Sequence, residues 1–126
     1  MKAIYLFTGA DGYSHFKYGS IINQSLVKTN STQFKETPAF SSYDWHNAPV
    51  LQFVITLKGK LEFKMNDNST FIIELGDVLI ANDLTGSGHQ WQLVDNNPWQ
   101  RVYCIFAEPL DIDSIFKEDA LEKVQK

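Results

Sequence analysis

The sequence predicts an all-β fold, and three observations carry this prediction. Aromatic residues make up 13% of the 126 residues, and aromatic side chains suit the pleated surface of a sheet. Residues 50–57 form an apolar run dense in β-branched side chains. Short segments of this kind recur along the chain, each ended by Gly, Pro, Asn or Asp. Short strands separated by frequent turns are typical of a sandwich or a barrel.

Composition places the chain among ordinary globular proteins and excludes several partners. The length fits one domain, which we expect to span residues 1–126. The formal charge is −4 and Lys and Arg form no cluster, which argues against nucleic acid and anionic membranes as partners. No apolar run approaches the ~20 residues of a membrane span. The single Cys104 excludes an intrachain disulfide, and we expect a cytoplasmic protein.

The first third of the chain gives the weaker strand signals. Residues 3–7 predict a short strand that ends at Gly9, and the turn-rich residues 8–15 follow it. Residues 21–36 mix apolar side chains with Ser, Thr and Asn, so we expect extended segments and turns there.

The signal strengthens in the middle of the chain. Residues 50–57 follow Pro49 and are apolar at nearly every position, which predicts a strand covered on both faces. Residues 60–65 alternate strictly between apolar and polar, which predicts a half-buried strand. The apolar face of that strand would carry Leu61, Phe63 and Met65.

Further strands are predicted over residues 70–75, 78–81, 89–94 and 102–107, with a loop of two glycines over residues 82–88. The alternation of the third of these strands places one group of side chains on a common face: His89, Trp91 and Leu93.

The tail differs from the rest. Its apolar residues recur near helical spacing, with acidic residues early and lysines late, which suits the helix dipole. We therefore expect a short C-terminal helix over residues 111–125, packed on the outside of the sheets.

Strand alternation before and within residues 50–57 sorts the side chains into two walls. The mixed wall carries Asp44, His46, Ala48, Val50, Gln52, Val54 and Thr56, and the apolar wall carries Trp45, Leu51, Phe53, Ile55 and Leu57. A mixed wall is typical of an interior that holds a ligand, because a few polar groups orient it among apolar ones. The apolar wall needs a cover, which a sheet, the C-terminal helix or a second subunit could supply. We expect a homodimer.

Two segments resemble the motifs of the cupin superfamily. His46, Ala48, Gln52 and Gly59 stand where the first motif has His-x-His, Glu and Gly. Gly76 and His89 stand at the two ends of the second motif. The resemblance covers residues 40–107, and the chain also resembles a group of small single-domain bacterial cupins with no assigned reaction. It implies one cupin-type jelly-roll β-barrel.

The resemblance also implies a metal site, with departures. A typical metal-binding cupin holds one divalent ion, such as Zn, Ni, Fe or Mn, with three His and one Glu. Here only His46, Gln52 and His89 would remain as ligands, because Ala48 cannot bind a metal and Gln52 lacks the charge of Glu. Asn82 stands where the second motif has Pro. This set is poorer than the three or four ligands, one of them anionic, of most such sites.

Several readings of these residues stay open. The leading function is binding of a small molecule inside the barrel by a group of five residues: His46, Gln52, Thr56, His89 and Trp91. The alternative is a divalent-metal-dependent enzyme of the dioxygenase or isomerase type, and no catalytic residue is assigned. A third class, a structural or interaction protein, would have an interior packed with Phe63, Met65 and Trp91. In that case the polar residues are internally hydrogen-bonded and Trp91 belongs to the core.

Other candidates have simpler readings. We expect His15 in a surface loop and Cys104 as a small buried side chain of a strand. Asp83 and Thr85 either form the rim of the site or only shape their loop.

Overall fold

The computed structural model describes residues 1–120, and its regular secondary structure consists almost entirely of strands. The strands are β1 (Lys2–Thr8), β2 (Ser14–Ile21), β3 (Thr29–Thr37), β4 (Ser42–His46), β5 (Gln52–Lys58), β6 (Leu61–Met65), β7 (Thr70–Ile73), β8 (Val78–Asn82), β9 (His89–Leu93), β10 (Trp99–Phe106) and β11 (Phe116–Glu118). A 3₁₀ turn, η1 (Ile112–Ser114), is the one helical element of this part of the chain. The all-β prediction is confirmed.

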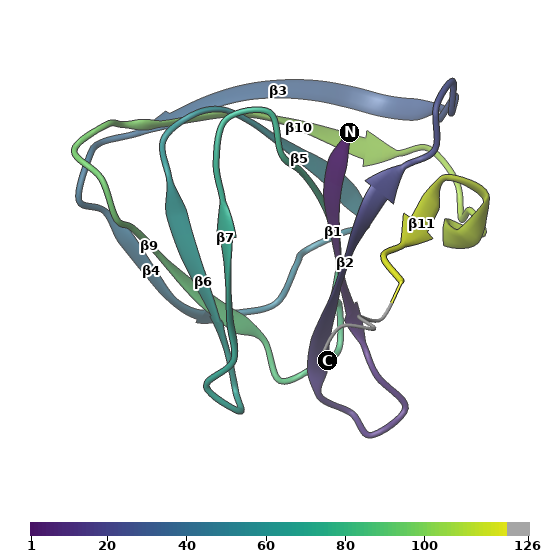
Figure 1. Ribbon diagram of the computed structural model, residues 1–126, viewed down its shortest axis with the longest axis horizontal. Coiled ribbons are helices and arrows are strands. Elements are labelled where there is room, and N and C mark those ends of the chain that lie inside the picture. Colours follow the sequence, from purple (N-terminus) through teal and green to yellow (C-terminus); the bar gives the residue numbers. More distant parts are fainter. Residues whose placement is uncertain (121–126) are drawn as a thin grey trace.

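The strands form two sheets that face each other (Figure 1). The larger sheet has the order β11-β2-β1-β8-β5-β10-β3, and the smaller has the order β4-β9-β6-β7. All neighbouring strands are antiparallel except β1 and β8, which are parallel. The architecture is therefore a β-sandwich with an internal space between two sheets.

The expected closed barrel is wrong. A barrel requires a hydrogen-bonded neighbour on both sides of every strand. In the described part of the chain, β3 and β11 end the larger sheet, and β4 and β7 end the smaller one. The chain turns sharply between β3 and β4, where Phe40 has a φ of 66°. Beyond this turn β4 pairs with β9, so β3 and β4 lie in different sheets.

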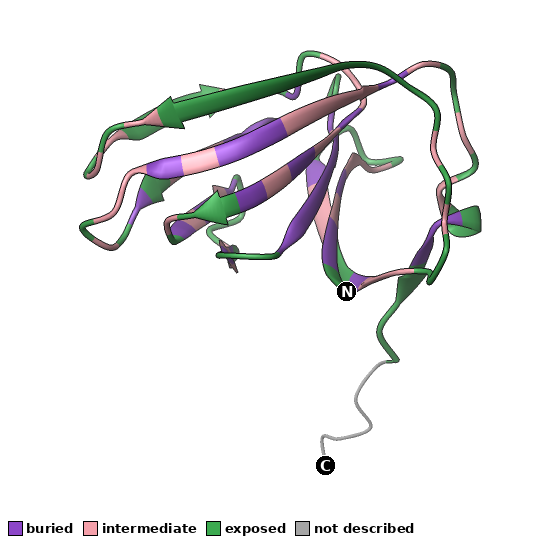
Figure 2. Ribbon diagram, turned by 90° about the horizontal axis from the view of Figure 1, so that it is seen from above, coloured by how far each residue is buried: buried purple, intermediate pink, exposed green. Residues whose placement is uncertain are grey.

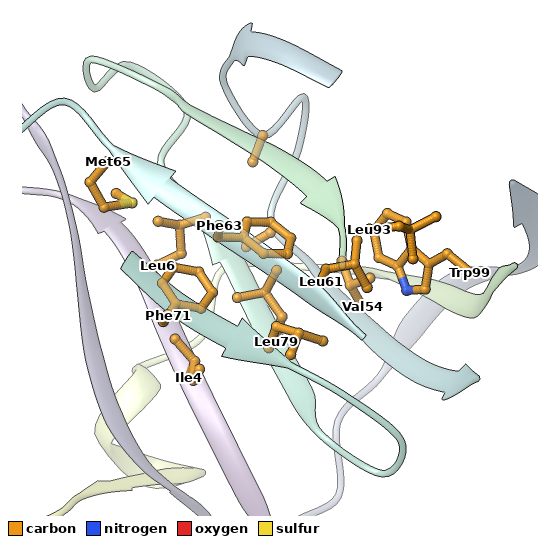
Figure 3. Packing of buried hydrophobic residues seen from close by; sticks show 13 residues of the cluster. Ile4, Leu6, Val54, Leu61, Phe63, Met65, Phe71, Leu79, Leu93 and Trp99 are labelled. Carbon is orange, nitrogen blue, oxygen red and sulfur yellow. The ribbon is translucent and has the colours of Figure 1, made fainter. Parts of the chain in front are cut away.

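The main core lies between the sheets (Figure 3). The apolar face predicted for residues 60–65 is confirmed, because Leu61, Phe63 and Met65 of β6 are all buried. They pack with residues of the larger sheet such as Val54 and Leu79. This core fills one part of the space between the sheets and fixes their separation.

A second apolar cluster covers the outer face of the larger sheet. Leu51, Phe53 and Ile55 from the predicted apolar wall pack there with Phe106 and the C-terminal segment. The expectation that the tail packs on the outside is confirmed, but the expected helix over residues 111–125 is wrong.

The described part of the tail forms η1 and β11 instead of a helix. Strand β11 pairs with the edge of β2, and the adjacent residues Ile115 and Phe116 are both buried. Pairing at an open sheet edge satisfies backbone groups, and this tertiary gain outweighs a weak helical pattern. The remainder of the predicted helix, residues 121–125, lies outside the described residues. Within residues 1–120, no helix combines the length and the apolar character that crossing a bilayer requires.

Candidate functional site

A cavity of about 810 Å³ opens between the two sheets. The larger sheet lines it through β3, β5, β8 and β10, and the smaller through β4, β6 and β9. This volume falls within the range of ligand pockets, roughly 300–1,000 Å³. Phe63 and Trp91 form part of the wall, whereas Met65 is buried in the core. The interior is thus not filled by these three side chains.

A β-bulge in β4 decides which side chains face the cavity. Tyr43 pairs with Trp91 and His46 pairs with His89. Between these two pairs β4 therefore contains one residue more than β9. Because of the extra residue, Tyr43 and His46 both line the cavity. Strict alternation had placed Asp44 beside His46, and this placement is wrong. Asp44 is exposed and does not line the cavity.

The His46 ring is held from behind by the backbone. Its Nδ1 lies 2.7 Å from the carbonyl oxygen of Asp44. Since a carbonyl only accepts, Nδ1 carries the proton and the neutral ring keeps a lone pair on Nε2. Burial lowers the pKa of His46, an effect that the Asp44 carbonyl opposes and nearby His89 reinforces. The neutral ring is therefore the favoured form in the fold.

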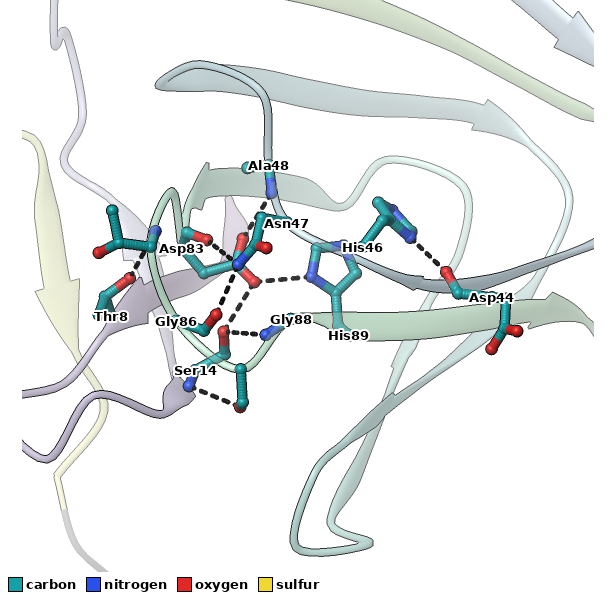
Figure 4. A network of polar contacts seen from close by, with 12 residues as sticks. Thr8, Ser14, Asp44, His46, Asn47, Ala48, Asp83, Gly86, Gly88 and His89 are labelled. Atoms are coloured by element: carbon teal, nitrogen blue, oxygen red, sulfur yellow. Dashed lines mark hydrogen bonds and ion pairs between the residues drawn. The ribbon is translucent and has the colours of Figure 1, made fainter.

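His89 is held by a buried carboxylate (Figure 4). Its Nδ1 donates to Asp83 Oδ2 at 2.8 Å, and the same oxygen accepts from Ser14 Oγ at 2.9 Å. The second carboxylate oxygen accepts from the backbone N–H of Ala48 at 3.0 Å. Asp83 thus connects the loop after β8 with β2, with β9 and with the segment after β4, and it orients the His89 ring.

The two imidazoles lie together at the cavity wall. The centroids of the His46 and His89 rings are 4.4 Å apart. Because Nδ1 of each ring is engaged behind the wall, Nε2 is the remaining polar atom of each ring. The two histidines, both predicted to face the interior, thus lie side by side at the cavity wall.

Gln52 completes the polar group predicted from the first motif. It lies at the start of β5, lines the cavity and is only 8% exposed. No described residue forms a hydrogen bond with its side-chain amide. An amide in this position normally has a partner, because burying it unpaired costs about 1–3 kcal/mol.

Two further predicted site residues differ in their placement. Trp91 lines the cavity and is half-buried, with its ring centroid 4.9 Å from that of Trp99. Thr56 is fully buried, does not line the cavity and accepts a hydrogen bond from Trp99 Nε1 at 3.1 Å. Thr56 therefore fixes the indole of Trp99 and does not itself face the interior.

The sequence reading missed the contribution of β10. This strand begins at Trp99, earlier than the predicted residues 102–107, and presents Trp99, Arg101, Tyr103 and Ile105 to the cavity. Arg101 is the chain's single arginine and is 3% exposed. The available signal was the spacing of Trp99 and Arg101, which are two residues apart. A predicted strand that began at Trp99 would have placed both side chains on one face.

Two other residues lie away from the cavity. His15 belongs to β2 instead of a surface loop, and its Nε2 lies 2.9 Å from a carboxylate oxygen of Asp11. This contact and a hydrogen bond from the Tyr13 N–H, which has the larger effect, lower the pKa of Asp11. Cys104 is partly buried in β10 and does not line the cavity.

The donor set does not fit a tightly held metal ion. The cavity wall supplies the imidazoles of His46 and His89 and the amide of Gln52, and it contains no Asp or Glu. Nowhere in residues 1–120 do three His, Cys, Asp or Glu side chains gather closely enough to form a metal site. Divalent cations in proteins usually have three or four protein ligands.

Comparison with known proteins identifies the fold. No protein-family model and no curated protein matches the chain. Among solved structures, a DUF861 family protein from Thermotoga maritima is 24% identical, with 59% of this chain and 77% of that chain covered and a TM-score of 0.49. An uncharacterized protein from Klebsiella pneumoniae with a double-stranded β-helix domain is 17% identical, with 79% and 82% covered and a TM-score of 0.48.

The cupin domain of Cnp3 from Schizosaccharomyces pombe gives the most informative comparison. It is 12% identical, 82% of this chain and 85% of that chain are covered, and the TM-score is 0.52. At this identity the likeness establishes the fold alone. The chain therefore has the cupin fold that its two motifs predict.

Proposed function

We propose that this cupin-fold chain binds a small molecule in the cavity between its sheets, with Gln52, His46, His89 and Trp91 in contact with it. The main support for this proposal is Gln52, whose buried side-chain amide faces the cavity and has no hydrogen-bond partner among the described residues. A ligand that donates to and accepts from this amide would satisfy it. In the ligand-free protein the unpaired amide lowers stability, and we attribute this loss to the requirements of binding.

The surrounding wall supports the same proposal. The lone pair on Nε2 of His46 can accept a hydrogen bond from a ligand hydroxyl or amine. The rings of Phe63, Trp91 and Trp99 supply flat apolar surface in the same cavity. A site for a small organic molecule usually combines a few polar side chains with many apolar and aromatic ones.

The test compares Gln52→Leu with wild type by thermal denaturation against a library of metabolites. Leu has a similar volume and no unpaired polar atom, so the ligand-free variant should be about 1 kcal/mol more stable than wild type. Compounds that raise the wild-type Tm should raise that of the variant by much less. Gln92→Leu is the control, because Gln92 is exposed on β9 outside the cavity and its loss should leave the response unchanged. The proposal fails if no compound stabilises the wild type, or if Gln52→Leu responds fully.

A divalent-metal-dependent enzyme is the second candidate, and one observation favours it. The Nδ1 atoms of His46 and His89 are both engaged by acceptors, which leaves two Nε2 atoms in one wall. Backing of a ring by a carboxylate, as Asp83 backs His89, is common among metal-binding histidines. We rank this candidate second because the wall offers no anionic ligand.

Elemental analysis separates the two candidates. Protein purified without chelator is expected to be metal-free if the cavity only binds a small molecule. Stoichiometric Zn, Ni, Fe or Mn that is lost in both His46→Ala and His89→Ala would instead support the enzyme.

A further inference from the structure

The charge of the cavity wall differs in sign from that of the whole chain. The chain carries a formal charge of −4, yet the cavity wall contains Arg101 and Lys35 and no carboxylate. Charges of one sign in a cleft with apolar walls concentrate ligands of the opposite sign.

Arg101 is held firmly and its charge is not balanced. Its Nε donates to the Tyr103 hydroxyl at 3.1 Å, and its Nη1 donates to Thr37 Oγ1 at 2.6 Å and to the Trp99 carbonyl at 3.1 Å. The guanidinium carbon lies 3.8 Å from the centroid of the Trp99 ring. All these partners are neutral, and Arg101 forms no ion pair with any residue in 1–120.

One edge of the guanidinium remains without a partner. The hydrogen bonds above use Nε and Nη1, and Nη2 donates to no described residue. Burying an unbalanced charge costs several kcal/mol unless an opposite charge or further hydrogen bonds compensate it. The stacking on Trp99 supplies only part of this compensation.

Lys35 lies beside Arg101 on the neighbouring strand. The two residues are directly opposite each other in the register of β3 and β10, and both line the cavity. Like charges directly opposite in a sheet repel each other, and an anion between them would remove this repulsion. Lys35 is exposed, so it lies at the accessible side of the pair.

The cationic pair and Gln52 occupy different positions along the larger sheet. Gln52 pairs with Ile105 and Thr56 pairs with Arg101. Arg101 and Ile105 are four positions apart along β10, which is roughly 13 Å of strand. A molecule in the cavity can therefore meet the cations with one group and Gln52 with another.

From these observations we infer that the ligand carries an anionic group, a carboxylate or a phosphate, which binds between Arg101 Nη2 and the Lys35 ammonium. Tyr103, Thr37 and Trp99 hold the guanidinium in position for it. This inference rests on the proposed small-molecule site and adds the chemical class of its ligand.

The test uses four aromatic probes of similar size: benzoate, phenyl phosphate, benzyl alcohol and benzylamine. Isothermal titration and the quenching of tryptophan fluorescence measure their binding to the full chain. We expect one or both anions to bind wild type at least tenfold more tightly than benzyl alcohol, and benzylamine to bind most weakly. The stronger anion identifies carboxylate or phosphate as the group recognised.

Variants then locate the effect. Arg101→Met should reduce the preference for the anion over benzyl alcohol to less than threefold, and Arg101→Lys should retain part of it. Lys64→Met removes the same charge from the outward side of β6, and it should keep the full preference. If Arg101→Met does not fold, Lys35→Met and the wild-type comparison of the four probes still decide the question.

The outcomes separate this inference from the proposed function. Benzyl alcohol that binds as tightly as the anions, and competes with them in wild type and Arg101→Met alike, overturns the inference and leaves the small-molecule site intact. If none of the four probes binds wild type, the inference is overturned, and the metabolite library decides on the site itself. Anion binding that survives in both Arg101→Met and Lys35→Met also overturns it.

Discussion

At the level of single residues, the cavity histidines owe their orientation to partners that the motifs do not contain. His46 is held by a backbone carbonyl that the bulge in β4 turns toward it. His89 is held by Asp83. For Asp83 the sequence left two interpretations open: a residue at the rim of the site, or a residue that only shapes its loop. The motif positions predicted that His46 and His89 meet. The contact of each histidine is local in sequence, but Asp83 is itself fixed by Ser14 and Ala48, which are distant in sequence and could not be predicted from spacing.

Asp83→Asn tests the role of the buried carboxylate. The amide cannot accept from Ser14, His89 and Ala48 at once, so at least one of these donors loses its partner. We expect the free energy of unfolding to fall by about 3 kcal/mol, measured by urea denaturation. Glu108→Gln removes an exposed charge and should change stability by less than about 0.5 kcal/mol. A loss no larger than that of the control would mean that Asp83 is not needed to hold the fold.

The lowered pKa of His46 predicts a pH dependence of stability. The folded state disfavours the protonated ring, so the unfolded state binds the proton first as the pH falls below about 6.5. The contribution of His46 to stability is therefore present at neutral pH and lost through this window. Urea denaturation between about pH 7 and pH 5 should give a smaller decrease for His46→Gln than for wild type. His15→Gln, which removes a histidine outside the cavity, serves as the comparison; equal slopes for wild type and His46→Gln would contradict the account.

At the level of elements, most strands followed from local patterns and the C-terminal tail did not. Strict alternation over residues 60–65 and a dense apolar run over residues 50–57 correspond to β6 and β5. Alternation failed where a bulge or a crossing between sheets interrupts the period, as it does between Tyr43 and Gln52. The tail was misread because an open edge of β2 is invisible in a local pattern.

Gly19→Ala tests why the tail forms a strand. A Cβ at residue 19 would collide with the Lys117 carbonyl oxygen and would approach the Phe116 ring to 2.6 Å. We expect β11 to detach from β2, with a loss of about 1–3 kcal/mol in stability. Hydrogen exchange at the Asp119 amide, which donates to the Tyr18 carbonyl, should accelerate. The neighbouring Ser20→Ala should leave this amide protected, and unchanged protection in Gly19→Ala would show that β11 does not depend on the close approach.

At the level of the whole molecule, β3 forms one edge of the larger sheet and is exposed along nearly its whole length (Figure 2). An exposed edge strand is a template for pairing with another chain. Phe34 on this strand is 74% exposed, and Leu57 on the same sheet is also exposed. The homodimer was predicted from the apolar wall, where Leu51, Phe53 and Ile55 pack with the C-terminal segment. A homodimer that pairs through β3 would cover this edge instead, and it stays a prediction.

Sedimentation velocity tests the homodimer. Wild type at micromolar concentration should sediment as a dimer, and Phe34→Glu should shift it to the monomer because a charge would be buried at the interface. Leu75→Glu is the control, since Leu75 is 71% exposed in the turn after β7 and is not part of the edge strand β3. A monomeric wild type would rule the dimer out.

The central claim is that the cavity between the sheets is a binding site, and the three tryptophans allow a direct measurement. Trp91 and Trp99 line the cavity, whereas Trp45 does not. In proton–nitrogen correlation spectra, titration with the stronger of benzoate and phenyl phosphate should shift the indole N–H signals of Trp91 and Trp99. The Trp45 indole signal should stay in place. Shifts confined to Trp45, or no shift at millimolar concentrations of either probe, would contradict the account.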